Sequence, residues 1–209
     1  MTVPPNKVRM SAEQRRASIV EAAIDLFSQR GFKGATTREL AANLGVTEPV
    51  LYQHFETKGA LYRAILEAKA ENKECVTPAL ERFTAEGDTR SFFLTLARAL
   101  LDWYLEDPRY ARMLMFSRLE EHELSDLFYQ SRVAVFYSWV TTHLEAMMDR
   151  GLIRKMNPLL AARIFGGMVA HQGLVYAIYA PGDLPAPKEE IVETVVSIFL
   201  SGVLTKCPD

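Results

Sequence analysis

The chain has 209 residues, of which 49% are hydrophobic and 24% are charged, and its formal net charge is −2. This length suits one large domain or a small module joined to a larger one, with ample apolar residues for a core. The slightly acidic balance excludes binding of a polyanion through overall charge, so any nucleic-acid surface must be local.

The charge is distributed unevenly along the chain. Residues 1–60 carry eight Lys and Arg against six Asp and Glu, so this segment is positive and the remainder is negative. Cys75 and Cys207 have no neighbouring Cys or His at metal-ligand spacing, and we therefore expect no metal, no cofactor and a reducing, cytoplasmic environment. The sequence has neither a signal-peptide core nor a membrane-spanning run, so we predict no membrane association.

An all-α fold is predicted, because apolar residues recur at spacings of three and four and period-2 alternation is nearly absent. After a flexible arm over residues 1–11, Ser11 and Gln14 form a capping-box pattern that begins the first helix, and Gly31 ends it. One apolar stripe of this helix faces the core: Ile19, Ala22, Ala23, Leu26 and Phe27.

Two short helices and a longer one are expected next. Thr36 caps the second helix, and Gly45 ends it as a left-handed residue. Thr47 is the predicted N-cap of the third helix, whose Leu51 and Phe55 turn inward. Thr57 caps a fourth helix that runs out near residues 75–78, which is the predicted domain boundary.

The rest of the chain is predicted to be a helical bundle. Proline and glycine separate its helices, so the whole chain should contain about nine helices. The expected helices of the bundle are 88–106, 108–120, 122–150, 158–180 and 187–205.

The segment over about residues 36–55 has the pattern of a helix-turn-helix motif. A short first helix can cross the DNA backbone while the second presents its side chains to base edges in the major groove. Gln53 could pair with adenine, Glu48 with cytosine, and Val50 or Pro49 could contact a thymine methyl group. Short helix pairs with an intervening glycine also occur in ordinary bundles, which is the alternative interpretation.

A series of short motifs follows the first helix and the helix-turn-helix segment without a gap: Ile19-Val-Glu-Ala-Ala-Ile-Asp-Leu-Phe27, Gly31-Phe32, Thr36-Thr37, Leu40-Ala41, Leu44-Gly-Val-Thr47 and Leu51-Tyr-Gln-His-Phe-Glu-Thr-Lys58. In order and spacing, these motifs resemble the N-terminal signature of the tetracycline-repressor (TetR) family over residues 12–72. Gly59 departs from the family pattern and weakens the first turn of the fourth helix.

The resemblance implies a DNA-binding domain over residues 12–72 and a ligand-binding and dimerisation domain over 76–209. It also implies that DNA contacts come from Thr36, Thr37, Thr47, Glu48, Pro49, Tyr52, Gln53, His54 and Lys58. Four basic residues near the N terminus are interpreted as a solvated segment, with an arm entering the minor groove as the alternative: Lys7, Arg9, Arg15 and Arg16.

The predicted function is a ligand-responsive transcriptional regulator, a repressor that binds double-stranded, palindromic operator DNA as a homodimer. Its effector would be a hydrophobic or amphipathic small molecule. The alternative is a helix-turn-helix protein with a structural or cell-division role and no small-molecule inducer. An enzyme is disfavoured, because the sequence contains no nucleophile-elbow, P-loop, dinucleotide-binding or zinc-protease motif.

Two residue sets are predicted in the second domain, each with ordinary core packing as the alternative. A dimer interface is expected from a stripe of small residues and a wide apolar helix face: Ala162, Gly166, Ala170, Gly173, Ala177, Ile191, Val195, Ile198, Phe199 and Gly202. A ligand pocket is expected from aromatic, Met and isolated polar residues: Trp103, Met113, Phe116, Phe136, Trp139, His143, His171 and Gln172.

Overall fold

A computed structural model describes residues 10–71, 77–121 and 123–205. These residues form eleven α-helices and two π-helical turns, and their only β feature is an isolated bridge between Ile153 and Leu204. The predicted all-α fold is therefore confirmed. The chain divides into two compact units, residues 1–72 and 73–209. Cys75, Cys207, Lys7 and Arg9 lie outside the described residues.

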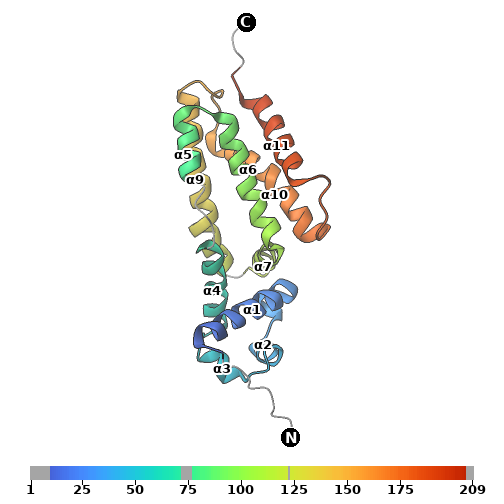
Figure 1. Ribbon diagram of the computed structural model, residues 1–209. Coiled ribbons are helices and arrows are strands. Elements are labelled where there is room, and N and C mark those ends of the chain that lie inside the picture. Colours follow the sequence, from blue (N-terminus) through green and yellow to red (C-terminus); the bar gives the residue numbers. More distant parts are fainter. Residues whose placement is uncertain (1–9, 72–76, 122, 206–209) are drawn as a thin grey trace. The chain divides into compact units, whose positions relative to one another are not determined.

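The first unit contains four helices, shown in blue to blue-green in Figure 1. The Ser11 capping box is present, with both reciprocal hydrogen bonds to Gln14 formed. Gly31 adopts a φ of 70° but only kinks the first helix, which continues for three more residues, so the predicted end is too early. Arg15 and Arg16 lie inside this helix and not in an arm. The helices are α1 (Ala12–Gly34), α2 (Thr37–Asn43), α3 (Glu48–Tyr52) and α4 (Lys58–Glu71).

The second unit contains the remaining helices. The predicted helix over 122–150 is interrupted by a π-turn, and the predicted helix over 158–180 ends in one. The elements are α5 (Thr77–Glu86), α6 (Thr89–Glu106), α7 (Pro108–Leu119), α8 (Glu123–Phe128), η1 (Tyr129–Val133), α9 (Ala134–Asp149), α10 (Pro158–Leu174), η2 (Val175–Tyr179) and α11 (Lys188–Val203).

Helix α5 was not predicted from the sequence. It offers two large apolar side chains, Leu80 and Phe83, which are too few to produce a clear helical period. Packing against α6 and α9 stabilises it, because Leu80 is buried there, and Arg150 donates a hydrogen bond to the Thr84 carbonyl. Tertiary contacts therefore determine this helix, whose sequence alone is a weak signal.

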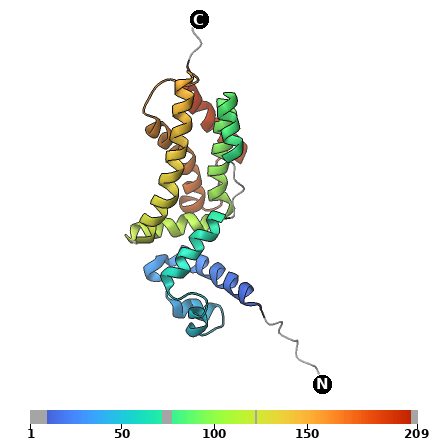
Figure 2. The same cartoon turned by 90° about the vertical axis from the view of Figure 1, so that its left-hand side faces the viewer.

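The core of the second unit lies between α6, α9, α10 and α11. Figures 1 and 2 show these helices running alongside one another, with α7 across one end in Figure 2. Phe93 from α6, Phe165 from α10 and Phe199 from α11 meet with ring centroids 4.8–5.0 Å apart. None of the described helices combines the length and apolar character needed to cross a membrane.

Candidate nucleic-acid interface and effector region

The turn between α2 and α3 is built from local sequence signals. The Thr36 hydroxyl accepts a hydrogen bond from the Glu39 N–H at 3.1 Å, which caps α2. Gly45 adopts a φ of 64°, and its N–H donates to the Ala42 carbonyl at 3.1 Å. This left-handed conformation satisfies a carbonyl at the helix end that would otherwise lack a partner. The predicted role of Gly45 is therefore confirmed.

Helix α3 is short, yet its hydrogen bonding extends beyond its last residue. The N–H of Gln53 donates to the Pro49 carbonyl, and that of Phe55 donates to the Leu51 carbonyl. Thr47 occupies the N-cap position as predicted, but its side chain makes no capping hydrogen bond. The helical conformation therefore extends past Tyr52, so that Gln53 is exposed on the surface and Phe55 is buried in the core.

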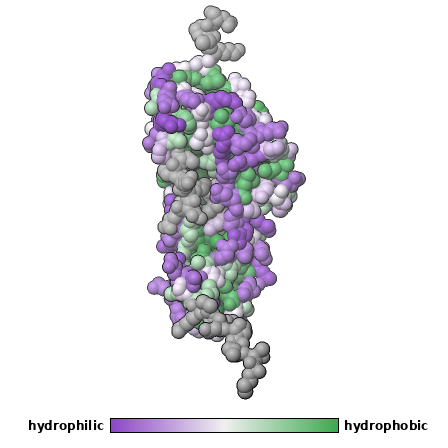
Figure 3. Space-filling view, viewed as in Figure 1, coloured by the Kyte–Doolittle hydropathy of each residue, from purple (hydrophilic) through white to green (hydrophobic). Residues whose placement is uncertain are grey.

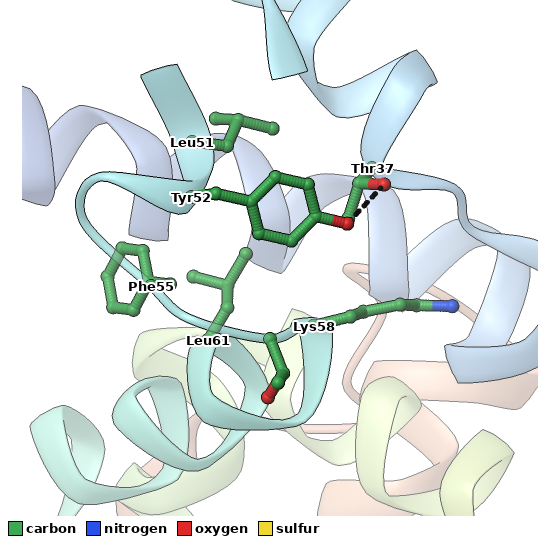
Figure 4. Close-up of a pocket in the computed structure, with 7 residues that line it drawn as sticks. Thr37, Leu51, Tyr52, Phe55, Lys58 and Leu61 are labelled. Carbon is green, nitrogen blue, oxygen red and sulfur yellow. Dashed lines mark hydrogen bonds between the residues drawn. The ribbon is translucent and has the colours of Figure 1, made fainter. Parts of the chain in front are cut away.

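A hydrogen-bond network joins the two helices of the motif. Thr37, the first residue of α2, donates from its hydroxyl to a Glu48 carboxylate oxygen at 2.9 Å. The Tyr52 hydroxyl lies 3.3 Å from the same Thr37 oxygen, as Figure 4 shows. Because Glu48 and Tyr52 stand at the two ends of α3, this network sets the orientation of α3 against α2. Sequence reasoning placed these residues on DNA but did not foresee their contacts with one another.

The space beneath this network is too small for an effector. A cavity of about 10 Å³ lies between α2, α3 and α4, and it could hold at most one water molecule. The helix-turn-helix unit therefore offers a surface and no small-molecule pocket at this point. The cavity is lined by Thr37, Leu51, Tyr52, Phe55, Thr57, Lys58 and Leu61 (Figure 4).

Lys58 begins α4 and is held against the end of α1. Its ammonium group donates a hydrogen bond to the Phe32 carbonyl and lies 4.3 Å from the centroid of the Phe32 ring. The Phe32 ring in turn packs edge-on against Tyr62, with centroids 5.5 Å apart. Thr57 caps α4 through the Ala60 N–H at 3.0 Å, which offsets the weakness that Gly59 introduces. Lys58 therefore has a structural contact that sequence reasoning did not foresee.

The predicted DNA-binding residues are accessible. Glu48 and Lys58 are partly exposed, so the surface offers both an acceptor and a donor besides hydroxyl groups. The exposed members of the set are Thr36, Thr47, Pro49, Tyr52 and Gln53, and the partly exposed ones are Thr37, Glu48, His54 and Lys58.

Comparison with known proteins decides the family. A model of bacterial regulatory proteins of the tetR family matches residues 19–65, and a model of the C-terminal domain of AefR-like transcriptional repressors matches residues 93–202. The second match by itself covers more than half of the chain. The chain belongs to the TetR family of transcriptional regulators. Members of this family are transcriptional regulators and not enzymes, in agreement with the prediction from the sequence that the protein is not an enzyme.

Individual relatives cover both units of this TetR-family regulator. The transcriptional activator FasR of Mycolicibacterium smegmatis is 28% identical over 198 residues, which are 93% of this chain and 85% of FasR. The class A tetracycline repressor of Escherichia coli is 43% identical over 83 residues, 39% of this chain and 36% of the repressor. The crystal structure of AibR with isovaleryl coenzyme A and operator DNA shares the fold, with a TM-score of 0.64 at 21% identity over 88% of this chain and 97% of AibR.

In the second unit of the TetR regulator, two of the predicted ligand residues lie together on α9. The rings of Trp139 and His143 have centroids 3.9 Å apart, and both stack on Phe92 of α6. His143 Nδ1 lies 2.9 Å from the Trp139 carbonyl oxygen, so the imidazole is already engaged within its own helix. This cluster packs at the α6–α9 contact.

The other predicted ligand residues are dispersed. Trp103 packs edge-on against Tyr104 of α6 at 4.9 Å, and Phe136 packs against Tyr137 of α9 at 5.5 Å. His171 is exposed on α10 and therefore lies outside the interior. Met113 is buried on α7, whereas Phe116 and Gln172 are partly buried.

The stripe of small residues on α10 is covered within the chain. A Cβ at Gly166 would lie 2.6 Å from the Tyr137 hydroxyl, and a Cβ at Gly173 would lie 2.3 Å from Tyr104 Cγ. The close approach that these glycines permit is therefore made by tyrosines of α9 and α6, which corrects the expectation that a partner helix meets them. Ala162 and Ala177 are likewise buried, and Ala170 is partly buried.

A different surface of α10 and α11 is apolar and open. Ile191, Val195 and Phe199 are each 7% exposed, but Ile198 is 60% exposed and Gly202 is exposed. On α10, four residues spaced by four, three and four positions face outward. Sequence reasoning did not assign Leu160, Ile164 or Gly167 to any site, and it assigned His171 to the ligand pocket. We call the exposed set the α10–α11 face: Leu160, Ile164, Gly167, His171, Ile198 and Gly202. Figure 3 shows hydrophobic patches interspersed with hydrophilic residues on the visible surface.

Proposed function

We propose that this TetR-family regulator is a ligand-responsive repressor that binds a palindromic operator as a homodimer and leaves it when a hydrophobic or amphipathic small molecule binds. The observation that carries the DNA-binding part is the Thr37–Glu48–Tyr52 network, because it presets α3 with its polar side chains outward. The match to AefR-like repressors supports repression. The relative FasR is an activator, which supports activation instead. The reporter experiment described below decides between repression and activation.

The proposal divides the DNA contacts by chemistry. Gln53 is exposed and carries the donor and acceptor pair that adenine requires in the major groove. Glu48 uses one carboxylate oxygen for Thr37 and keeps acceptor capacity for a cytosine amino group. Pro49 would contact a thymine methyl group. Phosphate contacts would come from Thr36, Thr37, Thr47, Tyr52, His54 and Lys58, which fix the register of α3 on the duplex.

The base-reading role is tested by gel shift and titration with the DNA upstream of the protein's own gene. Gln53→Ala should lose about 1–3 kcal/mol of binding and relax the preference at one base position. Gln29→Ala replaces an exposed glutamine on α1, outside the motif, and is the matched control. Equal effects of Gln53→Ala on specific and random DNA would remove Gln53 from base reading. Failure of the folded wild type to shift its upstream DNA at low salt would refute the proposed function.

The homodimer is proposed to form through the α10–α11 face. Ile164 and Ile198 are 52% and 60% exposed, and Gly167 and Gly202 have no neighbouring atom within 4 Å of a built Cβ. Open glycines beside apolar side chains allow two helices from a partner to approach closely. In a homodimer bound to a palindromic operator, the two α3 helices must meet major grooves roughly 34–36 Å apart.

Charged substitutions test this interface. Ile164→Glu and Ile198→Glu should give monomers in sedimentation, because each would bury an unpaired carboxylate in a dimer. Val135→Glu is the control, since Val135 on α9 is equally exposed at 60% but lies outside the proposed face. Tight operator binding should be lost with the dimer, because each half-site alone is held weakly. Dimers that persist in both Ile variants would place the interface elsewhere.

A reporter strain that carries the upstream DNA tests whether the protein represses or activates transcription. Deletion of the regulator should raise reporter output if it represses and lower it if it activates. Screening small molecules for release of purified protein from the operator then tests the sensing role. Operator binding that no amphipathic molecule reverses would favour the structural role without an inducer.

A further inference from the structure

Two basic side chains of the first unit are already engaged within the chain. Arg30 forms an ion pair with Glu39 at 3.1 Å. The Lys58 ammonium group donates a hydrogen bond to the Phe32 carbonyl. Arg16 on α1 differs from both, because it is exposed and forms neither a hydrogen bond nor an ion pair with any described residue. Its five N–H donors are therefore available to a partner from outside the chain.

The ring of Phe55 nevertheless restrains the position of Arg16. The central carbon of the Arg16 guanidinium lies 4.7 Å from the centroid of this ring, and Phe55 is only 6% exposed. A guanidinium in this position is attracted to the face of the ring, and contact with a buried ring restricts an otherwise flexible side chain. Arg16 is therefore an exposed cation whose position is restrained before any DNA binds.

Phe55 places this cation at the end of α3. The Phe55 N–H donates to the Leu51 carbonyl at 3.0 Å, so Phe55 continues the helical path of α3. Tyr52, a proposed phosphate contact, lies three residues before Phe55 and is therefore its neighbour on the surface of this path. Arg16 thus reaches from α1 to the segment of chain that carries the proposed DNA contacts.

The carboxylates nearest to Arg16 in the sequence and beside Phe55 do not neutralise it. Glu13 lies one turn earlier on α1, and Glu56 directly follows Phe55. Both are exposed, and neither forms an ion pair with Arg16 in the part of the chain that the structure describes. A phosphate of the DNA backbone offers two oxygen atoms that match the paired N–H donors of a guanidinium. Such a phosphate would supply the acceptor that the chain itself does not.

We propose that Arg16 binds a phosphate of the operator backbone, held in position by its contact with Phe55. This inference rests on the proposed operator binding and adds a residue to its backbone contacts. A guanidinium at the end of α3 would fix the register of that helix along the duplex without reading a base. The sequence interpretation of Arg16 did not include this role, because the contact depends on the packing of α1 against the end of α3.

The experiment measures binding of the full chain to the DNA upstream of its own gene and to random DNA, by fluorescence anisotropy at several salt concentrations. Arg16→Gln removes the charge, while its side chain still covers part of the Phe55 ring. The slope of log affinity against log salt concentration should flatten by about 0.9, the value expected for one lost phosphate contact. At about 50 mM salt the affinity for both DNAs should fall about tenfold, with the base preference unchanged.

Arg15→Gln is the matched control, because it removes the same charge from the neighbouring position of α1, where no contact with a described aromatic ring is made. It should bind with the slope of the wild type. Arg16→Lys keeps the charge but lacks the paired donors, so it should retain most of the slope and lose less affinity than Arg16→Gln. Thermal unfolding of each variant checks that the fold is retained.

An unchanged slope in Arg16→Gln would overturn the proposal. Equal flattening in Arg15→Gln would also overturn it, because the effect would then come from overall charge, as would a loss of slope in Arg16→Lys as large as in Arg16→Gln. A loss of affinity confined to the upstream DNA would make Arg16 a base-reading residue instead. Each of these results requires DNA binding by the wild type and so leaves the proposed function intact. A folded wild type that binds neither DNA at low salt would refute the proposed function, and this inference with it.

Discussion

A methyl group at Gly173 is predicted to destabilise the second unit from within. In Gly173→Ala the new Cβ would lie 2.3 Å from Tyr104 Cγ, 2.4 Å from Cδ2 and 2.7 Å from Cβ. These Tyr104 atoms are at the root of the side chain, next to its backbone, so they cannot move aside as a flexible tip would. The substitution therefore forces α6 and α10 apart or expels the tyrosine ring.

The expected magnitude follows from two opposing effects. Overpacking of this kind costs about 1–3 kcal/mol, and the contact at Gly173 is short enough to fall in the upper part of that range. Alanine has a higher helix propensity than glycine, which offsets about 1 kcal/mol of this loss of stability. The net loss should therefore be about 1–2 kcal/mol, a decrease in Tm of roughly 2–8 °C. Gly59→Ala, where the built Cβ has an ordinary contact at 3.7 Å, should instead gain about 0.5–1 kcal/mol.

The assay is thermal and urea unfolding at several protein concentrations, with a double-mutant cycle. In a Tyr104→Ala background the contacts with Cγ and Cδ2 are gone and only the 2.7 Å approach to the Cβ of residue 104 remains, so Gly173→Ala should cost less there than in the wild type. Packing within the chain predicts a deficit that does not depend on protein concentration. A deficit that varies with concentration would place Gly173 at a dimer interface, and a Gly173→Ala protein as stable as Gly59→Ala would refute the packing argument altogether.

Further predictions concern the motif and the helix ends. Thr37→Val removes both hydroxyl contacts and should weaken operator binding about tenfold in a titration, whereas Thr37→Ser should retain it. Lys58→Ala should flatten the salt dependence of operator binding by about one unit and also lower unfolding stability by about 1–3 kcal/mol, since its ammonium group holds the Phe32 carbonyl. Asp88→Ala removes the cap of α6 and should cost about 0.5–2 kcal/mol in urea unfolding at neutral pH. Hydrogen bonds from Ser91 lower the pKa of Asp88 in the folded state below its ordinary value of 3.8. The stability that the Asp88 cap contributes is therefore fully present above pH 3.8, and it should be lost as the pH falls through the lower pKa of the folded state. Because the pKa of Tyr104 is raised from 10.0 to about 12, the wild type should lose stability between those pH values relative to Tyr104→Phe, and equal alkaline unfolding curves would contradict this.

Much of the helix-turn-helix unit was predictable from the sequence because its signals are local. The Ser11 box, the Thr36 cap and the left-handed Gly45 each involve residues within a few positions of one another, so their hydrogen bonds depend little on the rest of the chain. The apolar spacing of α1 likewise identifies its buried face, with Ile19 and Phe27 in the core.

Tertiary structure alone decided what covers each face. The periodicity of α10 shows that Gly166 and Gly173 share one side of the helix. The space beside a glycine can be filled by a tyrosine of the same chain as readily as by a partner helix, and here tyrosines of the same chain fill it. The contacts between Thr37 and Tyr52, and between Tyr104 and Gly173, join helices whose relative orientation no local signal encodes. The spacing of residues along a helix determines only which side of the helix they lie on. Which element packs against that side depends on the packing of the whole unit.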